Sequence, residues 1–477
     1  MHQFIGRKYE LKRLSTVLDS SAASFIVING RRRIGKSRLI QEFAKPFPFF
    51  RFAGLVPRKG LKAQDQRNEF ARQFREQFKI PMVKKNDWGE IFSQLALQIK
   101  KNRVVILFDE ISWMAYDDSD FLGKLKNAWD FHFSNNSKLI LFLCGSVSSW
   151  IDENLLSSTA FMGRPTLHLL LKELELPDCN HFWGDSSNNF ISSYEKLKIL
   201  SLTGGVPRYL ELMNPKLTAE ENAKNLFFNK ESVLFDEFKK IFVDVYGKRN
   251  SVYKSIIELL ISEKLTQEQI AQSLDFPIGG DLSTKLNDLI LGGFIARDYT
   301  WKLESGKISN LSRYRLCDNY LRFSLKYILP NRALIEKGRF LNRSLKSLPG
   351  WDTIIGLQFE NLVLNNHKKI LECLNLLDED IIFDNPYFQR KTNRIQGCQI
   401  DYLIQTRHDS LYICEIKFDK EPIGMNIIKE VKEKMLKIKS PKFMSKRAVL
   451  IHVNGVKESV MDISFFYKII DFSQLLM

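Results

Sequence analysis

The chain has 477 residues, and 44% of them are hydrophobic, so it is long enough for about three domains with ordinary globular cores. Its formal net charge of +16 favours a polyanionic partner, most simply nucleic acid, although basic surfaces also occur without one. The six scattered cysteines, without a Cys-x-x-Cys pair, are typical of reduced thiols in a cytoplasmic protein. Residues 1–20 are charged, unlike a signal peptide, and no apolar run reaches membrane-spanning length, so we expect no membrane partner.

The chain opens with a segment that has two interpretations. Residues 4–11, Phe-Ile-Gly-Arg-Lys-Tyr-Glu-Leu, lead into an amphipathic pattern that ends near Leu18. By its residues alone, the segment could be a capped surface helix. It resembles the F-x-G-R-x-x-E-L entry of AAA-like and related ATPases, and this resemblance, which is favoured, implies that the segment lies against adenine.

A glycine- and lysine-rich loop follows. The apolar run 25–29 predicts a buried strand, residues 30–37 read Gly-Arg-Arg-Arg-Ile-Gly-Lys-Ser, and a helical pattern comes next. This order is that of a P-loop, in which backbone N–H groups and a helix N-terminus surround phosphate oxygens. Lys36 can reach the β- and γ-phosphates of ATP, and the Ser37 hydroxyl can ligate Mg²⁺. The residues that we expect to bind the nucleotide are Gly30, Arg33, Gly35, Lys36, Ser37 and Arg38.

The next strong signal is the run 103–110, a continuous apolar strand that ends in Asp109 and Glu110. A strand that is apolar on both faces belongs in a parallel sheet covered by helices. Open α/β sheets bind ligands at the carboxyl ends of their strands, which places both acids beside the P-loop. Asp109 is the expected second anchor for Mg²⁺, as in other P-loop NTPases. Glu110 resembles the residue that polarises the attacking water in that class.

Two further residues are candidates for contact with the γ-phosphate. Ser146 ends the apolar strand 138–146, where AAA-type proteins place a polar sensor residue; it could equally cap a helix that starts near Val147. Arg164 precedes the strand-like run 166–171 and is either a γ-phosphate finger, in cis or in trans, or a surface arginine.

Residues 202–210, Leu-Thr-Gly-Gly-Val-Pro-Arg-Tyr-Leu, place two glycines and a proline before a helical segment, which predicts a tight turn. The stretch resembles the G-G-[IV]-P-x-Y-L signature of the archaeal-type ATPases, relatives of the AAA+ and STAND groups. The resemblance implies a helical lid over the nucleotide, with Arg208 as its phosphate-sensing residue. It covers residues 1 to about 240, where all the motifs occur in order.

The pattern changes between residues 250 and 330. Helical runs at 252–262, 266–274 and 282–291, the second opened by a T-x-x-Q capping box, precede two alternating runs at 294–303 and 312–316. Three short helices followed by a hairpin form the winged-helix pattern, which can place its third helix in a DNA major groove. That helix is poor in arginine, and such modules also serve for packing. The candidate DNA-facing residues are Ser283, Thr284, Lys285 and Asn287 on the helix and Arg297, Lys302 and Lys307 on or near the wing.

The C-terminal region carries a second constellation. Two consecutive predicted strands present Asp401 near the start of one and Glu415 and Lys417 near the end of the next, and residues 415 and 417 share a face. Two carboxylates that hold Mg²⁺ and a lysine that activates water or stabilises charge are suited to metal-dependent phosphodiester hydrolysis.

This pattern matches the PD-(D/E)xK nuclease fold, in which Glu360 on the helix 356–371 would be the acid of the first helix. The family often has proline before the aspartate, whereas Ile400 stands here. The competing interpretation is a pair of solvated hairpin strands with incidental charges. The lysine-dense helix 427–439 is either a phosphate-contacting face or a solvated one.

We therefore expect an α/β protein: a P-loop NTPase parallel sheet with a helical lid, then a winged helix-turn-helix, then an α/β restriction-endonuclease-like domain. The architecture resembles archaeal-type ATPases with a C-terminal domain of unknown function. The expected boundaries are 1–175, 176–248, 249–330 and 331–477.

The expected function is ATP hydrolysis and DNA binding, with a Mg²⁺-dependent nuclease controlled by nucleotide state and a homo-oligomer left open. The alternative is a STAND-like nucleotide-operated switch whose nuclease-like domain only binds nucleic acid or protein. The retention of Glu360, Asp401, Glu415 and Lys417 together favours the enzyme.

Overall fold

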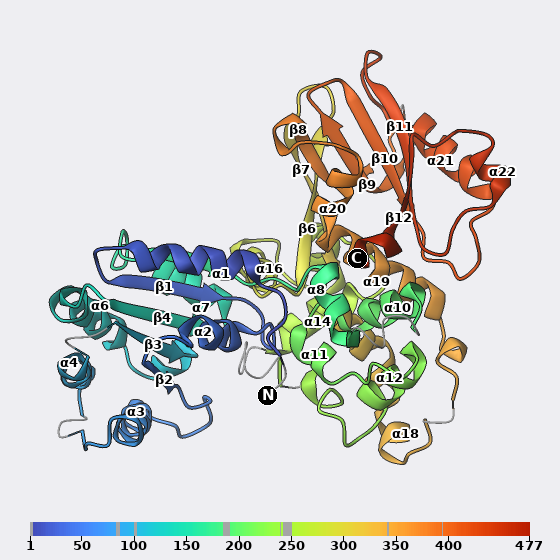
Figure 1. Cartoon of the computed structure of the whole chain (residues 1–477). Coiled ribbons are helices and arrows are strands. Elements are labelled where there is room, and N and C mark those ends of the chain that lie inside the picture. Colours follow the sequence, from blue (N-terminus) through green and yellow to red (C-terminus); the bar gives the residue numbers. More distant parts are fainter. Residues whose placement is uncertain are drawn as a thin grey trace. The chain divides into compact units, whose positions relative to one another are not determined.

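The computed structural model describes residues 3–82, 86–99, 103–184, 191–238, 240–241, 250–340, 343–393 and 395–477. Its contacts divide the chain into two compact units (Figure 1). The first consists mainly of Met1–Lys172, and the second consists mainly of Glu173–Lys239, Ser251–Leu286 and Phe294–Met477. The predicted boundary at residue 248 lies outside the described residues. No helix in the described ranges is long and apolar enough to cross a membrane.

The first unit is built on a parallel five-stranded sheet with the order β2-β3-β4-β1-β5. Its three central strands are buried along their whole length, as their continuous apolar sequences predict. The expected α/β fold with a parallel sheet is thus confirmed. The strands are β1 (Ser24–Asn29), β2 (Phe49–Ala53), β3 (Val104–Asp109), β4 (Leu139–Gly145) and β5 (Leu167–Leu170).

Helices cover both faces of this sheet, because alternate side chains of each strand point in opposite directions. Phe25 and Val27 of β1 join a core with α3, α4 and α6, whereas Ile26 and Ile28 join a core with α1 and α2. The helices are α1 (Lys8–Ser15), α2 (Lys36–Ala44), α3 (Ala63–Phe78), α4 (Trp88–Gln98), α5 (Ile111–Met114), α6 (Phe121–Phe131) and α7 (Ser148–Ile151).

The second unit begins with the helices α8 (Leu176–Asn180), α10 (Ser193–Thr203), α11 (Pro207–Glu211) and α12 (Ala219–Phe227). The tight turn predicted from the glycines lies between α10 and α11. Gly204 has φ +62°, and a Cβ on Gly205 would lie 2.4 Å from the carbonyl oxygen of Leu174. Only glycine fits both constraints, and Pro207 then starts α11 at a position that tolerates its missing N–H.

A segment of three helices and a hairpin follows, which we call the helix–hairpin segment. Its elements are α14 (Asn250–Leu259), α15 (Gln267–Ser273), α16 (Gly280–Leu291), β6 (Ile295–Lys302) and β7 (Lys307–Leu316). The predicted capping box is confirmed, since Thr266 and Gln269 each accept a hydrogen bond from the other's backbone N–H. Leu265 also pairs with Tyr314 in an isolated antiparallel bridge, so the residue just before the N-cap of α15 contacts the hairpin.

The C-terminal part contains a second five-stranded sheet, with the order β12-β11-β10-β9-β8. Strands β8, β9 and β10 are antiparallel neighbours, whereas β10, β11 and β12 run parallel. The strands are β8 (Ile381–Gln389), β9 (Cys398–Thr406), β10 (Ser410–Ile416), β11 (Ser445–His452) and β12 (Lys468–Asp471). The helices are α17 (Asn319–Phe323), α18 (Arg332–Glu336), α19 (Trp351–Asn365), α20 (His367–Cys373), α21 (Asn426–Lys437) and α22 (Glu458–Met461).

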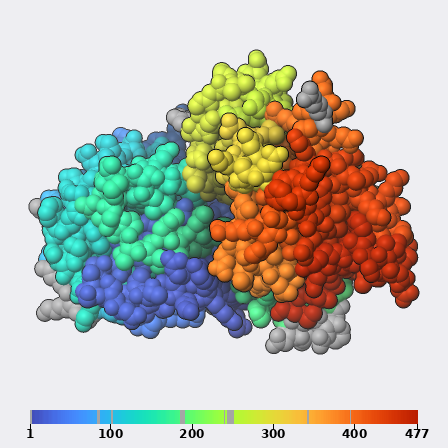
Figure 2. Space-filling view, turned by 90° about the horizontal axis from the view of Figure 1, so that it is seen from above, coloured from blue at the N-terminus to red at the C-terminus, as the bar shows by residue number. Residues whose placement is uncertain are grey.

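The hairpin of the helix–hairpin segment packs against this second sheet. Trp301 of β6 is 2% exposed, belongs to the same apolar core as Ile400 and Leu411, and donates its indole N–H to Gln405. Figure 2 shows the yellow hairpin directly against the orange and red C-terminal segment. The two segments therefore share a core within the second unit, which leaves less of the hairpin surface open to DNA than a protruding wing would.

The arginine expected near the wing is also engaged within the hairpin. The Arg297 guanidinium lies over the rings of Tyr299 and Tyr314, 4.8 and 5.6 Å from their centroids, and donates to the Ser312 hydroxyl. Lys302 and Lys307, in contrast, are exposed. Of the predicted wing cations, the two lysines are thus the better placed for contact with a phosphate.

Candidate nucleotide site and candidate phosphodiesterase site

The P-loop has the backbone that its glycines predict. It connects β1 to α2, and Gly35, at the N-cap of α2, has φ +93°. Gly30 has φ +144°, and a Cβ there would lie 2.5 Å from the carbonyl oxygen of Leu171. Arg33 also adopts a positive φ, 71°. The predicted loop residues, from Gly30 to Arg38, therefore lie together at the carboxyl end of β1 and the start of α2.

The lysine of the loop folds back over its own backbone. Lys36 Nζ donates to the carbonyl oxygens of Gly30 at 2.8 Å and Arg31 at 3.1 Å. Its side chain is almost fully buried, so these two oxygens replace water as partners of the ammonium. The same ammonium is thereby held within the loop where a phosphate would enter.

Asp109 ends β3 next to the P-loop helix, as predicted. Its Oδ2 accepts a hydrogen bond from the Ser37 hydroxyl at 2.9 Å, and it also contacts Arg51 Nη2 at 2.6 Å. Ser37 and Asp109 are hard oxygen donors in direct contact, which is the donor set that Mg²⁺ prefers. Asp109 is only 3% exposed, and its contacts with Ser37 and Arg51 hold its carboxylate in place.

Glu110 and Ser146 form a second pair at the same edge of the sheet. Glu110 Oε2 accepts hydrogen bonds from both the N–H of Ser146 at 3.0 Å and its hydroxyl at 2.9 Å. Glu110 has φ 53°, a left-handed conformation that costs a non-glycine residue roughly 1 kcal/mol or more. The N-cap of α7 is Val147, so Ser146 does not take the capping position, and its role as a sensor of the γ-phosphate remains a prediction.

The entry segment is tied to the P-loop through Arg7, which is 6% exposed. Its guanidinium donates to the carbonyl oxygens of Ile34 at 3.0 Å and Lys172 at 2.6 Å, and it pairs with Glu10. The arginine of the entry motif therefore holds the P-loop and the segment after β5 together through backbone hydrogen bonds.

The other two predicted arginines have local partners. Arg164 makes a two-point ion pair with Asp130 of α6, with both distances at 2.8 Å. This pair, with a smaller contribution from Lys126, lowers the pKa of Asp130 to about 2. Arg208 lies in the second unit and pairs with Glu211 one turn later on α11. The finger and phosphate-sensing roles of these arginines remain predictions.

In the second unit, neighbouring strands bring Asp401 and Glu415 together. Tyr402 of β9 is paired with Cys414 of β10, which sets the two acids side by side. Asp401 Oδ2 accepts the backbone N–H of Ile416 at 3.0 Å. Glu415 is 2% exposed, and its burial, followed by the charge of Asp401, raises its pKa.

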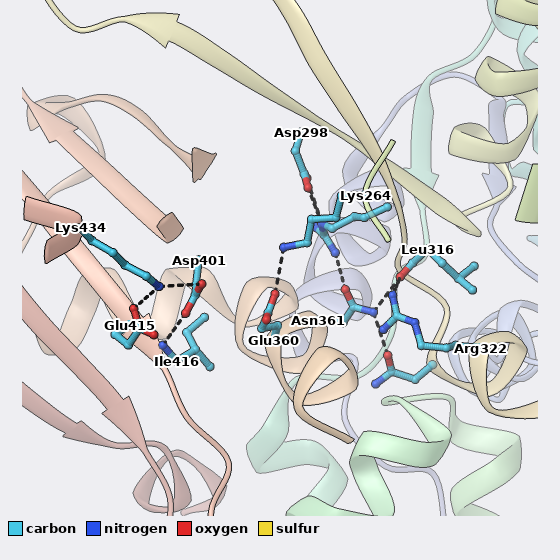
Figure 3. A network of polar contacts seen from close by, with 12 residues as sticks. Lys264, Asp298, Leu316, Arg322, Glu360, Asn361, Asp401, Glu415, Ile416 and Lys434 are labelled. Atoms are coloured by element: carbon cyan, nitrogen blue, oxygen red, sulfur yellow. Dashed lines mark hydrogen bonds and ion pairs between the residues drawn. The ribbon is translucent and has the colours of Figure 1, made fainter. Parts of the chain in front are cut away.

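Two lysines compensate these carboxylates. Lys434 of α21 contacts Glu415 Oε2 and lies 3.5 Å from Asp401 Oδ1, so one ammonium bridges both acids (Figure 3). Lys417 lies 3.2 Å from Glu415 Oε1 and 2.9 Å from Glu430. Burial alone would lower the pKa of Lys434, but the carboxylates of Asp401 and Glu415 outweigh it and raise that pKa.

Glu360 does not join this group. It lies on α19, as predicted, but its carboxylate pairs with Lys264 of the helix–hairpin segment at 3.0 Å (Figure 3). The next residue, Asn361, is buried and bonds to Arg315 and Asn319, which fixes this face of α19 towards that segment. Across the described ranges, no three His, Cys, Asp or Glu side chains form a group that could hold a metal ion. The expected site therefore consists of Asp401, Glu415 and Lys417 without Glu360.

A cavity of about 810 Å³ opens beside Lys417. Helix α10 contributes Tyr194 and Lys198 to its wall, α19 contributes Trp351, the segment after β10 contributes Phe418, and α21 contributes Glu430. Tyr194 and Phe418 stack with their ring centroids 5.0 Å apart. The carboxylate pair thus has an adjoining space with ammonium groups and flat aromatic rings on its wall.

Comparison with known proteins identifies the first part of the chain. Residues 4–213 match the family model described as an ATPase domain predominantly from Archaea. Residues 4–213 are an ATPase domain. The match includes α8, α10 and α11, so the ATPase domain extends from the first unit into the second.

Over 380 residues the chain is 28% identical to an uncharacterized protein of Methanocaldococcus jannaschii, covering 79% of each chain. It is also similar to two solved structures. A Walker-type ATPase of Pyrococcus abyssi is 17% identical, covers 68% of this chain and 96% of its own, and has a TM-score of 0.49. The ORC2 protein of Aeropyrum pernix is 13% identical, covers 70% of this chain and 95% of its own, and has a TM-score of 0.43.

The sequence interpretation missed two residues. In the ATPase domain, Arg51 reaches Asp109 because β2 pairs in parallel with β3; an arginine inside the aromatic run 49–53 was the available signal. Lys434 belongs to the lysine-dense helix 427–439, for which the sequence indicated either a phosphate-contacting face or a solvated one. Lys434 lies seven residues after the buried Ile427 and three residues after the buried Val431. This spacing places it on the inward face of α21.

Proposed function

We propose that the chain is an ATP-hydrolysing, DNA-acting protein whose C-terminal part cleaves phosphodiester bonds with Mg²⁺ under the control of nucleotide state. The ATPase domain is the established part. The nuclease rests on one observation: Asp401 and Glu415 converge on adjacent strands with the ammonium groups of Lys417 and Lys434. The order of α19, three antiparallel strands, α21 and a parallel strand β11 supports this proposal.

In the ATPase domain, Lys36 would exchange its two carbonyl partners for phosphate oxygens of ATP. Ser37 and Asp109 would hold Mg²⁺, which neutralises phosphate charge when bound. Glu110 would then orient the attacking water and draw off its proton. Its two hydrogen bonds from Ser146 keep the carboxylate in a single orientation for that task.

In the C-terminal part, the donor set fits a divalent cation. Asp401 and Glu415 already share one cation, the Lys434 ammonium, which shows that the electrostatic potential between them favours positive charge. Mg²⁺ would be held by these two carboxylates and would polarise the scissile phosphate. Lys417, beside the 810 Å³ cavity, would stabilise the negative charge that develops on the phosphate oxygens.

DNA binding is supported by the formal charge of +16 and by the helix–hairpin segment, where Ser283, Thr284, Lys302 and Lys307 lie near or at the surface. If several phosphate contacts form, affinity should fall by roughly 10³-fold or more between low and moderately high salt. An affinity that stays level over that range would speak against this part of the proposal.

The second candidate is a STAND-like nucleotide-operated switch whose C-terminal part only binds nucleic acid or protein. One arrangement favours it: Lys434 neutralises both acids while Glu360 is occupied by Lys264. When lysines of the chain itself neutralise these carboxylates, a metal ion is not required to offset their negative charge.

The experiment that separates the two is cleavage of labelled DNA structures by the wild type and Asp401→Ala, with Mg²⁺ or Mn²⁺ and with or without ATP. Asp462→Ala, an exposed aspartate on the same part of the chain, is the matched control. Cleavage by the wild type and the control but not by Asp401→Ala supports the nuclease. Equal cleavage by all three would indicate a contaminant, and good DNA binding without any cleavage would favour the switch.

A further inference from the structure

Two arginines from separate segments face one small cavity in the second unit. Arg313 lies on β7, and Arg390 follows directly after β8. The cavity measures about 370 Å³, and its remaining wall consists of Thr266, Glu268 and Gln269 at the start of α15. It lies apart from both sites described above, because none of its residues belongs to them.

The two guanidinium groups repel each other. Burial, followed by the charge of Arg390, lowers the pKa of Arg313. Arg313 is held in place by Phe388, whose ring centroid lies 4.2 Å from the guanidinium carbon, and its Nε is buried without a hydrogen-bond partner. Within the described part of the chain, no carboxylate forms an ion pair with either arginine.

Glu268 is the acidic group at this cavity, and its carboxylate accepts a hydrogen bond from the Thr266 side chain. Its pKa is lowered first by the hydrogen bond from the Thr266 side chain and only lastly by the charge of Arg390. The wall therefore carries two positive charges against one negative charge. A half-buried cation without a counter-ion is unfavourable, and an anion between two guanidiniums would remove the repulsion.

The position of the cavity indicates which anion. Arginine presents planar N–H groups that match phosphate oxygens. The neighbouring helix α15 is joined to α16 by a hydrogen bond of 2.8 Å from Gln267 to the Ser283 hydroxyl. In a helix-turn-helix, the helix before the groove-reading helix crosses the DNA backbone. A phosphate at the start of α15 would thus lie at the edge of the groove that α16 would enter.

We propose that Arg313 and Arg390 bind one backbone phosphate of duplex DNA. This inference rests on the proposed DNA binding and names the contact that positions the helix–hairpin segment on the duplex. Because a phosphate carries no sequence information, the contact strengthens binding equally for all sequences.

The test measures binding of the full-length chain to short labelled duplexes of two unrelated sequences across a range of KCl concentrations. Arg390→Ala is the main variant, because Arg390 is exposed and its loss should not disturb folding, whereas Arg313 packs on Phe388. We expect Arg390→Ala to bind both duplexes more weakly. The slope of log affinity against log salt concentration should become shallower by about 1, which corresponds to the loss of one phosphate contact. Glu268→Gln should bind more tightly at low salt, since it removes a repulsive charge. The exposed Arg407 provides the control, and Arg407→Ala should match the wild type.

Three results would overturn the inference. If the wild type binds but Arg390→Ala has the same affinity and slope, the cavity takes no phosphate. If the loss differs between the two sequences, the arginine contacts bases and the assignment is wrong. If the wild type does not bind duplex DNA at all, the proposed DNA binding fails and this inference fails with it.

Discussion

Replacement of Lys434 by methionine perturbs the bridge between Asp401 and Glu415 with little change in side-chain length. Methionine removes the ammonium and leaves Glu415, which is 2% exposed, with Lys417 as its remaining cation. The two carboxylates then repel each other without the group that lies between them. We expect a less stable C-terminal sheet and, in the same variant, a stronger response to divalent metal ions.

The magnitude follows from the geometry. Opposite unit charges about 4 Å apart interact by about 4 kcal/mol at the effective dielectric constant near a protein surface. Lys434 is 25% exposed and loses hydration in the bridge, which offsets part of that attraction. A net loss of about 2 kcal/mol in the local opening free energy is the expected result. Because burial already raises the pKa of Glu415, its ionised form destabilises the fold, and the loss should shrink as pH falls and Glu415 binds a proton.

The assay is amide hydrogen exchange of peptides from β9 and β10, with and without millimolar Mg²⁺ or Mn²⁺. The N–H of Ile416, which donates to Asp401, lies at the end of β10 and reports directly on this site. At a fixed metal concentration, tighter metal binding stabilises the folded state more, by an amount that grows with the logarithm of the affinity, so the ions should restore more protection to the variant than they add to the wild type. Lys437→Met is the control, since Lys437 lies one turn later on α21 in an exposed pair with Glu433 and should lose less than about 0.5 kcal/mol.

One result would refute this reasoning: equal losses of protection in Lys434→Met with and without metal. The two carboxylates would then be a structural ion-pair network that does not accept a divalent ion, and the switch would become the better description of the C-terminal part.

Three further predictions concern the first unit. Lys36→Ala should abolish ATP binding, whereas Glu110→Gln should retain it and lose about 10²-fold or more in turnover, measured by phosphate release; normal turnover would mean that another residue activates the water. Ser146→Ala removes one of two bonds to Glu110 and should lower turnover by about tenfold with ATP affinity unchanged; a full rate would show that Glu110 needs no such support. Arg164→Ala should destabilise the first unit by about 1 kcal/mol in chemical unfolding at neutral pH. Arg164 is the largest cause, together with Lys126, of the lowering of the pKa of Asp130 from 3.8 to about 2. The advantage of the wild type therefore exists above pH 3.8 and disappears as pH falls through 2; its persistence in stronger acid would contradict the pair.

Local sequence patterns predicted most of the elements that carry the candidate sites. Continuous apolar runs, without the alternation of a half-exposed strand, predicted the buried strands β1, β3 and β4. The P-loop glycines predicted the left-handed backbone before α2. The element ends were less accurate. The helix expected from Gly356 begins at Trp351, directly after Gly350 in a left-handed conformation, and it ends at Asn365, where α20 takes over.

The sequence was sufficient to predict where Lys36, Ser37, Asp109 and Glu110 lie. These residues are at or after the ends of buried strands, and the carboxyl ends of those strands meet at one edge of a parallel sheet. The sequence was also sufficient to predict that Asp401, Glu415 and Lys417 lie together, because consecutive strands joined by a short turn commonly form an antiparallel pair.

Only the tertiary structure decided the partners that come from distant segments. Lys434 bridges the two acids, Lys264 occupies Glu360, and Trp301 anchors the hairpin in the second sheet. None of these follows from the local patterns used to predict elements, since charged and aromatic side chains fit many surfaces. Which surface each one meets depends on how helices and sheets pack over separations of 19 to 104 residues. The same packing sets which charges are buried, and therefore which lysines are phosphate contacts and which are counter-ions.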